Sequence, residues 1–497
     1  MQRQLVPGSG SSERPASRGF FGALHALFRL TAFAGTAGIG TACIGTVGWG
    51  TWGTCHASAD SPPSVDWYQA TLVSFGWAAF EPSISADGRR IAFRSAFNFT
   101  GQNPDVNFEI FLFDRDTEEF TQITQTSVFF GNTQPHITPD GSAVLFRSLY
   151  NFTGENPDGS AELFEATVAT GVIKQLTFSP GGSMLTTTRL SADGSSAVFL
   201  SSADGSLDVM RYRRATGELT AITQVSGFTV DMPAVNGDGS IILFRSKYNF
   251  DGSNPEGNFE IWCWQDGLPV VHLTQTPAGK INELPSVDAA GRYVTFVSRA
   301  NIVGENLGST REIFIADRFD GSYAQVTPSF PTGAHLEPII SSNGAYVLFE
   351  SERDPVGLNR DKNRELFRFE RATSELSQLT ETTGGISIAG MSDPAKSNYV
   401  AVSMDGEHFA YRCEHALDPE ANDPEPQVNL EAFIGSLPRR GNPLADLDLD
   451  GDVDAGDLAI CFGAWGPVSN PQSATADLNQ DGLVDFADVS ILLGAWT

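Results

Sequence analysis

The chain has 497 residues, a length that corresponds to about two to four domains. Its 60 acidic side chains outnumber the 31 basic ones and give a formal net charge of −29 at pH 7. This balance argues against a nucleic-acid partner, because phosphate binding needs clustered Lys and Arg. Hydrophobic residues make up 41% of the chain, which is enough for a packed core, and its five Cys are too few for a disulfide scaffold.

Residues 1–59 are predicted to be an export signal. A basic start leads into a long uncharged stretch that ends in Ala57-Ser58-Ala59, which places small side chains at the −3 and −1 positions of a cleavage site. We therefore expect a signal peptide cleaved after Ala59 and a protein that is secreted, periplasmic or on the cell surface. An uncleaved membrane anchor is the alternative, because the stretch is long, and a lipid anchor at Cys43 is a weaker third option.

Residues 60–438 contain seven copies of one unit. EPSISADGRRIAFRS at residue 81 recurs as QPHITPDGSAVLFRS at residue 134 and in five further copies, the last being the more divergent YVAVSMDGEHFAYRC at residue 399. Each copy predicts four short strands, with a Gly-containing hairpin turn after the first. An aromatic residue occupies the same place in every second strand and is predicted to be core: Phe93, Phe146, Phe199, Phe244, Phe296, Phe349 and Tyr411.

Repeated four-stranded units of this size predict an all-β β-propeller. The seventh copy has no fourth strand of its own, but WYQATLVS at residues 67–74 matches the fourth-strand pattern. The N-terminal strand is therefore expected to complete the last blade, which would protect two sheet edges. We predict seven blades, with six as the alternative if the seventh copy is too degenerate. The S-x-D-G turn and the E-I-F and Q-L-T strands resemble the TolB-type, WD-like propeller repeats of exported bacterial proteins.

The loops between the second and third strands are long and rich in oxygen ligands, as in AFNFTGQNPDVNFE. Such oxygens are the kind that bind a hard cation such as calcium. In the other interpretation, Asn-Pro-Asp-Gly forms turns and a Glu begins each third strand. Those Glu residues would then pair with arginines of the neighbouring strand, Arg94, Arg147 and Arg245. Recurrence in nearly every blade favours the structural interpretation.

The first strands predict the lining of the central channel. One parity is aliphatic in every copy, and the other is expected to border the channel: Ser83, His136, Arg189, Ala234, Ser286, Ile339 and Ala401. Glu81 and Glu337 are expected near the channel mouth. A His, an Arg and carboxylates suit an acidic sugar or lyase chemistry, yet the chain has no G-x-S-x-G, H-E-x-x-H, P-loop or CxxC motif.

Residues 444–497 contain ten Asp and no Lys, Arg or Glu, and they predict two calcium loops. DLDLDGDVDAGD and DLNQDGLVDFAD each carry oxygen ligands at positions 1, 3, 5, 9 and 12 of a twelve-residue loop, with Gly at position 6 and a backbone carbonyl at position 7. The predicted ligands of two Ca²⁺ ions are Asp446, Asp448, Asp450, Asp452, Asp454 and Asp457 in one loop and Asp477, Asn479, Asp481, Leu483, Asp485 and Asp488 in the other. A short apolar helix is predicted after each loop.

The tandem of loop-helix repeats at the C-terminus resembles a type I dockerin, a small α domain that binds calcium. Residues 439–443 are interpreted as the linker before it. The resemblance implies docking to a cohesin-like receptor through the helix faces. Positions 10 and 11, which select the partner in cellulosomal dockerins, are Ala455-Gly456 and Phe486-Ala487 here.

Two functions are compatible with this architecture. The first is an exported, non-enzymatic binding or scaffold protein, whose propeller recognises a surface polymer or a protein and whose tail docks in a calcium-dependent way. The alternative is a propeller-type polysaccharide lyase or glycosidase carried on a dockerin. The sequence shows no convergent His or carboxylate cluster, and this favours the first function.

Overall fold

The computed structural model describes the following parts of the chain: residues 65–71, 79–127, 131–180, 185–202, 206–225, 230–330, 335–382, 400–403, 408–413, 431–436, 447, 453, 455–468, 476–478 and 483–494. The predicted signal peptide with its cleavage site after Ala59 and the predicted linker at residues 439–443 lie outside these ranges. Within them, no helix has the length and apolar character needed to cross a bilayer.

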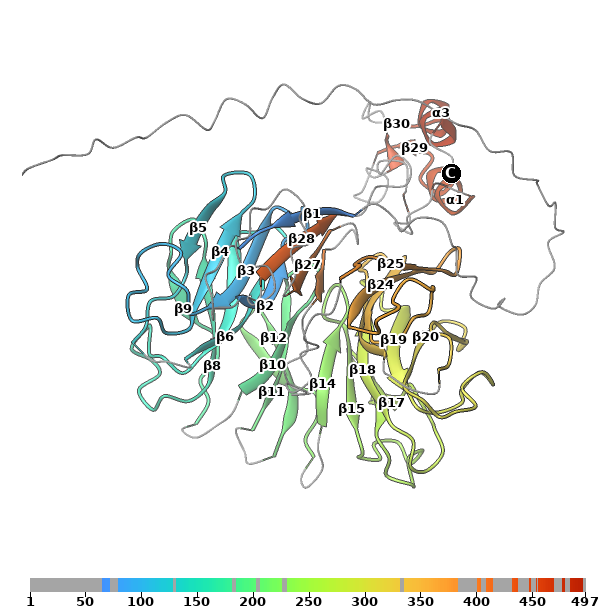
Figure 1. Cartoon of the computed structure of the whole chain (residues 1–497), viewed down its shortest axis with the longest axis horizontal. Helices are drawn as coiled ribbons and strands as arrows, with labels where there is room; N and C mark the ends of the chain where they lie inside the picture. Colours follow the sequence, from blue (N-terminus) through green and yellow to red (C-terminus); the bar gives the residue numbers. More distant parts are fainter. Residues whose placement is uncertain are drawn as a thin grey trace, which may run out of the picture. The chain divides into compact units, whose positions relative to one another are not determined.

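Seven four-stranded antiparallel sheets follow one another along the chain, so the seven-bladed propeller is confirmed (Figure 1). Blade 1 consists of β2 (Ala79–Ile84), β3 (Arg90–Ser95), β4 (Glu109–Asp114) and β5 (Glu119–Gln122). Blade 2 consists of β6 (Asn132–Ile137), β7 (Ala143–Ser148), β8 (Glu162–Thr167) and β9 (Ile173–Gln175). Blade 3 consists of β10 (Leu185–Leu190), β11 (Ser196–Ser201), β12 (Asp208–Arg213) and β13 (Glu218–Ala221).

Blades 4 to 6 repeat the same order. Blade 4 consists of β14 (Val230–Val235), β15 (Ile241–Ser246), β16 (Glu260–Gln265) and β17 (Val271–His272). Blade 5 consists of β18 (Asn282–Val287), β19 (Tyr293–Ser298), β20 (Glu312–Asp317) and β21 (Tyr323–Gln325). Blade 6 consists of β22 (His335–Ile340), β23 (Tyr346–Ser351), β24 (Glu365–Glu370) and β25 (Glu375–Gln378).

Blade 7 is built from both ends of the propeller. It contains β26 (Val400–Val402), β27 (His408–Cys413), β28 (Glu431–Ser436) and the N-terminal β1 (Asp66–Gln69), which pairs with β28 (Figure 1). The predicted closure is therefore confirmed. β1 also makes the side-chain hydrogen bond of an ordinary fourth strand. Gln69 Nε2 donates to the Thr71 carbonyl, and Gln122 Nε2 of β5 donates to the Thr124 carbonyl in the same way.

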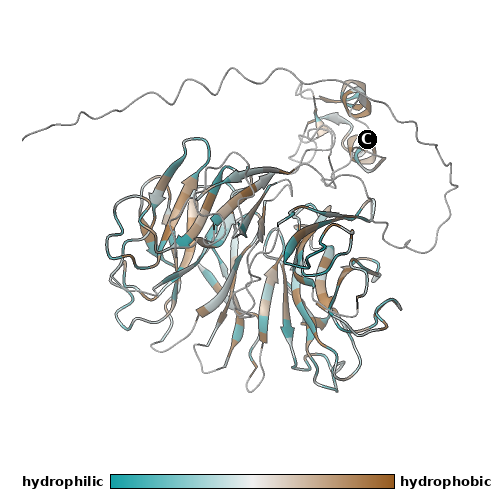
Figure 2. Cartoon of the chain, viewed as in Figure 1, coloured by the Kyte–Doolittle hydropathy of each residue, from teal (hydrophilic) through white to brown (hydrophobic). Residues whose placement is uncertain are grey.

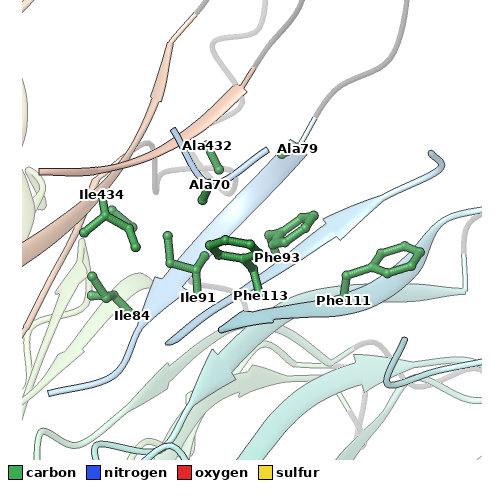
Figure 3. Close-up of a cluster of buried hydrophobic side chains, with 10 residues drawn as sticks. Ala70, Ala79, Ile84, Ile91, Phe93, Phe111, Phe113, Ala432 and Ile434 are labelled. Carbon is green, nitrogen blue, oxygen red and sulfur yellow. The ribbon is translucent and has the colours of Figure 1, made fainter. Parts of the chain in front are cut away.

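The core lies between neighbouring blades. The second-strand aromatics are almost fully buried, as predicted. Consecutive strand residues such as Ile91, Ala92 and Phe93 are all buried, so apolar side chains lie on both faces of the strand. Hydrophobic residues recur along the strands of the blades (Figure 2). At the junction of blades 7 and 1, Phe93, Phe111 and Phe113 pack with Ala432 and Ile434 (Figure 3). Gly88, at φ 67°, belongs to the same junction, where a Cβ atom would stand 2.4 Å from the ring of His408.

The Glu residue that begins most third strands has a structural role. Glu109 is fully buried; its carboxylate accepts hydrogen bonds from the hydroxyls of Thr124 and Thr126 and from Asn132 Nδ2. The expected pairing of these Glu residues with Arg94, Arg147 and Arg245 is wrong. Arg94 lies opposite Ile110 and Glu109 lies opposite Ser95 in the strand register, so the two side chains point to opposite faces of the blade.

The described part of the C-terminal unit has a helix at the end of each loop, α1 (Ala455–Gly463) and α3 (Phe486–Gly494), in agreement with the predicted helices. A two-residue ladder joins β29 (Gly466–Pro467) to β30 (Leu483–Val484). Equivalent positions of the two repeats share one small core: Val453 with Val484, and Cys461 with Leu492. The repeats therefore stabilise each other, since neither alone buries a complete core.

Candidate functional site

The innermost strands of all seven blades border a central channel. One cavity of about 200 Å³ is lined by residues such as Ser83 and His136, and a neighbouring one of about 220 Å³ by Arg189, Met232, Leu284 and Glu337. All seven residues of the predicted channel parity line one of these cavities. Six of the seven aliphatic residues of the other parity line these cavities as well, so the cavities do not distinguish the two parities, and the assignment of one of them to the channel stays a prediction.

Each of the first six innermost strands carries a bulge at the same place. The bulged residues adopt positive φ angles of 51° to 56° although none is a glycine: Glu81, Gln134, Thr187, Met232, Leu284 and Glu337. This left-handed conformation is costly for residues with a side chain, above all for a β-branched one such as Thr187. We call the end of the channel surrounded by these six residues the channel mouth. The sequence analysis did not recognise this ring, and the signal was the X-Pro step that follows the bulged residue in five of the six strands.

Hydrogen bonds link the ring from one blade to the next. Glu81 Oε2 accepts from the backbone N–H of Gln134 at 2.8 Å, and Gln134 Oε1 accepts from that of Thr188 at 3.0 Å. Deeper in the channel, Ser83 Oγ accepts from the backbone N–H of Ile137 at 3.0 Å. Several polar channel residues thus hold neighbouring blades together.

Arginines gather around the channel mouth, and each blade contributes one. Four occupy the equivalent second-strand position, one lies in a first strand, and the other two come from just before a third strand. In blade order they are Arg94, Arg147, Arg189, Arg245, Arg311, Arg364 and Arg412. Several stack on phenylalanines: the Arg94 guanidinium lies 4.7 Å from the Phe108 ring centroid, and that of Arg412 lies 5.1 Å from Phe80.

Burial shifts the protonation of the channel residues. It lowers the pKa of His136 to about 3, with the positive charge of Arg189 acting in the same direction, so this imidazole is neutral at physiological pH. Burial raises the pKa of Glu337 to about 7; the nearby Glu350 adds to the rise, while Arg189, Arg364 and Arg311 oppose it. Glu81 and Glu337 belong to blades 1 and 6, on either side of blade 7.

In the C-terminal unit, the last residue of each loop closes that loop. Asp457 and Asp488, both fully buried, stand at position 12. Asp457 Oδ1 accepts from the backbone N–H of Leu447 at 2.5 Å, and Asp488 Oδ1 accepts from that of Leu478 at 2.8 Å, so each carboxylate reaches position 2 of its loop. An oxygen-only donor set closed in this way fits a hard cation such as Ca²⁺.

Of the remaining predicted calcium ligands, the structure describes three. Asp477 is almost buried, Asp485 Oδ1 accepts from the backbone N–H of Ala487 at 2.7 Å, and Leu483 lies in β30. Seven others lie outside the described residues: Asp446, Asp448, Asp450, Asp452, Asp454, Asn479 and Asp481. In the described part of the chain, no three His, Cys, Asp or Glu side chains are grouped as a metal site.

Three aromatic side chains form an exposed cluster on the C-terminal unit. Phe462 and Trp465 stack at a centroid distance of 5.7 Å, and Trp465 meets Phe486 edge-on at 4.9 Å. Phe486, at loop position 10, is 73% exposed. The cluster joins the end of α1 to the start of α3.

Comparisons with known proteins agree with both units. Residues 68–254 match the family model of the TolB beta propeller domain, and residues 444–494 match that of the dockerin type I domain. An oligogalacturonate lyase in complex with manganese is 16% identical, with a TM-score of 0.51, over 76% of this chain and 97% of that one. The oligogalacturonate lyase of Vibrio parahaemolyticus is 12% identical, with a TM-score of 0.52, over 76% and 99%. At these identities the likeness concerns the fold alone. No curated protein matches the chain.

Proposed function

Since the chain joins a propeller of TolB-type repeats to a C-terminal type I dockerin domain, we propose that it is an exported, non-enzymatic binding protein. It is secreted, periplasmic or displayed at the cell surface. The propeller recognises a surface polymer or a protein at the channel mouth. The C-terminal unit docks to a cohesin-like receptor when calcium is bound.

The hydrogen bonds that Asp457 and Asp488 accept from position 2 of their loops support calcium binding. Asp446, Asp448, Asp450, Asp454 and Asp457 would hold one ion with the carbonyl of Asp452. Asp477, Asn479, Asp481, Asp485 and Asp488 would hold the second with the carbonyl of Leu483. Bound calcium supplies the positive charge that this unit lacks, because its ten Asp face no Lys or Arg of their own segment.

The aromatic cluster is the proposed docking surface for the receptor. Phe462, Trp465 and Phe486 expose large apolar area, and such residues commonly anchor protein interfaces. Phe486 stands at the loop position that selects partners in the dockerins that the sequence resembles. Because α3 begins at Phe486, within the second loop, calcium binding and docking are coupled.

The chemistry of the channel supports binding more than catalysis. Glu81 accepts a hydrogen bond from the Gln134 N–H and lies 3.6 Å from Arg94, so its carboxylate already has partners within the protein. His136, with a pKa of about 3, is too weak a base for proton transfer near neutral pH. Both groups instead contribute to a fixed polar surface.

One observation favours the alternative, a propeller-type polysaccharide lyase or glycosidase. Glu337 has a pKa of about 7 and lines the same cavity as Arg189, and this is the range in which a carboxyl group exchanges protons efficiently. An acidic polysaccharide that is cleaved by the wild-type chain, but not by the Glu337→Gln or Arg189→Ala variants, would establish this enzyme instead.

The experiment that tests the proposal is a pull-down from envelope and extracellular fractions with the mature chain, in calcium and in chelator. We expect one partner that chelation releases and that a Phe486→Ala variant fails to capture. A Val172→Ala variant, which removes an exposed apolar side chain of the propeller, is the matched control and should capture it normally. Equal capture in calcium and chelator would overturn the docking role.

A further inference from the structure

The junction of blades 7 and 1 shows how two blades fill the space between their outer strands. In blade 7, Tyr68 of β1 pairs with Ile434 of β28, and in blade 1, Phe113 of β4 pairs with Phe120 of β5. Across the junction, the Tyr68 and Phe113 rings stack at a centroid distance of 6.0 Å. Arg115 directly follows β4 and places its guanidinium 5.2 Å from the Tyr68 ring centroid. Two rings and one guanidinium therefore fill this junction.

The same positions carry small side chains at the junction of blades 4 and 5. Val271 of β17 pairs with Cys263 of β16, so the valine stands where blade 7 has the stacked tyrosine. Ala316 of β20 pairs with Tyr323 of β21, so the alanine stands where blade 1 has the stacked phenylalanine. Both rings of the stacked pair are therefore missing from this junction.

A cavity of about 500 Å³ lies at the junction of blades 4 and 5, and Cys263, Val271, Ala316 and Tyr323 all line it. Cys263 and Ala316 also belong to the core cluster that joins these two blades, so the cavity borders apolar side chains. Its volume lies within the range of about 300–1,000 Å³ that is typical of ligand pockets. The missing ring pair therefore leaves a pocket of ligand size.

Arg318 directly follows β20, in the place that Arg115 has in blade 1, and it also lines the cavity. Its guanidinium donates to the Gly291 carbonyl and lies beside the Cys263 thiol. In the described part of the chain it lies over no aromatic ring. A guanidinium is attracted to the face of an aromatic ring, so this end of the cavity favours an aromatic ligand.

Exposed apolar side chains lie beside the cavity. Val271 forms part of its wall, Leu268 lies in the turn before β17, and Phe319 directly follows Arg318; all three are exposed. A free aromatic molecule inside the cavity would leave these side chains in water, whereas a polypeptide would cover them. Exposed apolar side chains around a pocket are typical of a surface that binds a protein.

We infer that the cavity between blades 4 and 5 binds an aromatic side chain of a partner protein, which takes the place of the missing ring pair and stacks on Arg318. This site goes beyond the proposed function, because it is built from outer strands and shares no residue with the two channel cavities. An aromatic anchor that enters a pocket and is surrounded by further contacts is the arrangement that dominates the binding energy of many interfaces.

Saturation-transfer NMR on the full mature chain tests the inference with three probes. They are N-acetyltryptophanamide, N-acetylleucinamide and a short peptide with Trp between apolar residues. The tryptophan amide should bind with a Kd of about 1 mM, and the leucine amide at least about five-fold more weakly because it has no ring to stack. The peptide should bind at least about ten-fold more tightly than the tryptophan amide, because its flanking side chains cover the exposed apolar residues beside the cavity.

Variants that restore one ring of the pair should close the site. Val271→Tyr and Ala316→Phe introduce the residues found at these places in blades 7 and 1, and each should weaken binding of the tryptophan amide at least about ten-fold. Val172→Tyr is the matched control, because it makes the same substitution at an exposed valine between β8 and β9, and it should change the affinity less than about two-fold. Thermal unfolding identifies a variant that fails to fold, and Val271→Tyr, at an exposed position, then provides the measurement.

Arg318→Gln tests the stacking. It should weaken binding of the tryptophan amide about two- to five-fold and leave that of the leucine amide unchanged, a difference that a purely structural role of Arg318 would not produce. Arg299→Gln, at an exposed arginine directly after β19, is its control and should leave both affinities unchanged.

Equal binding of the tryptophan and leucine amides would overturn the inference. So would unchanged affinity for the tryptophan amide in both Val271→Tyr and Ala316→Phe. A peptide that bound no more tightly than the tryptophan amide would overturn the assignment to a partner protein, since a free aromatic compound would then satisfy the site equally well.

Discussion

Thr71 and Glu431 lie 360 residues apart in sequence, yet the Thr71 hydroxyl donates to Glu431 Oε2 at 2.5 Å inside blade 7. Thr71 directly follows β1, and Glu431 begins β28. Both side chains are buried, and the Thr71 hydroxyl oxygen also accepts from the backbone N–H of Ala432 at 2.9 Å. The propeller is therefore closed by a hydrogen-bond pair that repeats the Thr124–Glu109 pair of blade 1.

A Thr71→Val variant should destabilise the propeller by about 1–3 kcal/mol, because it leaves the buried carboxylate of Glu431 short of a donor. Chemical unfolding followed by intrinsic fluorescence measures the change. Thr121→Val in β5 removes an exposed hydroxyl from another outer strand and should stay within about 0.5 kcal/mol of the wild type. Equal stability of Thr71→Val and wild type would show that the closure depends on backbone pairing alone.

A second prediction concerns His335, which is fully buried at the start of β22. Burial lowers its pKa to about 3, and Arg353, which pairs with Glu312 at 2.7 Å, adds to the effect. Below pH 6.5 the His335 imidazole is therefore protonated in the unfolded chain but stays neutral in the native state. Stability is therefore complete above pH 6.5 and is lost as pH falls toward 3, by up to about 1.4 kcal/mol per pH unit.

A His335→Asn variant should lose less stability between pH 7 and pH 5 than the wild type, by about 2 kcal/mol. Asn is the residue found at the equivalent place in blades 2 and 5, where Asn132 and Asn282 donate to Glu109 and Glu260. Denaturation midpoints across this pH range measure the effect. An identical pH slope for variant and wild type would contradict the depressed pKa of His335. His272→Asn, which alters a half-exposed histidine, serves as the control.

Much of the fold is predictable because it repeats. One Gly turn and one aromatic per copy, with a Glu at the start of most third strands, specify the blade, and the fourth-strand pattern near residue 69 specifies the closure. The first strands were correctly expected to border the channel, but residues of both parities line its cavities. These features depend on neighbouring residues within one unit, so the sequence alone carries them.

The arginine ring is not predictable in the same way. Arg94, Arg189 and Arg311 come from a second strand, a first strand and the residue before a third strand, so no alignment of the copies places them together. Their convergence depends on how adjacent blades meet. The wrong pairing of Glu109 with Arg94 has a similar origin, because sequence proximity does not reveal that the two side chains occupy opposite faces.

A third prediction tests the calcium loops. Asp457→Ala and Asp488→Ala should each remove about one ion from the stoichiometry of the full chain, because the position-12 carboxylate closes its loop. Calcium titration by calorimetry provides the count. Ser490→Ala alters an exposed hydroxyl of α3 and should leave two ions bound. If both Asp variants still bound two ions, position 12 would not be a ligand.

The fourth prediction concerns Glu337, whose pKa is raised to about 7 by burial and then by the charge of Glu350. Since the native state holds this proton more tightly than the unfolded chain, the stability that the protonated carboxyl contributes is present below about pH 4.5 and is lost as pH rises through 7. Glu337→Gln should therefore make the propeller more stable at pH 8, by about 1–2 kcal/mol, and flatten its pH dependence between 5 and 8. Urea unfolding at several pH values measures both.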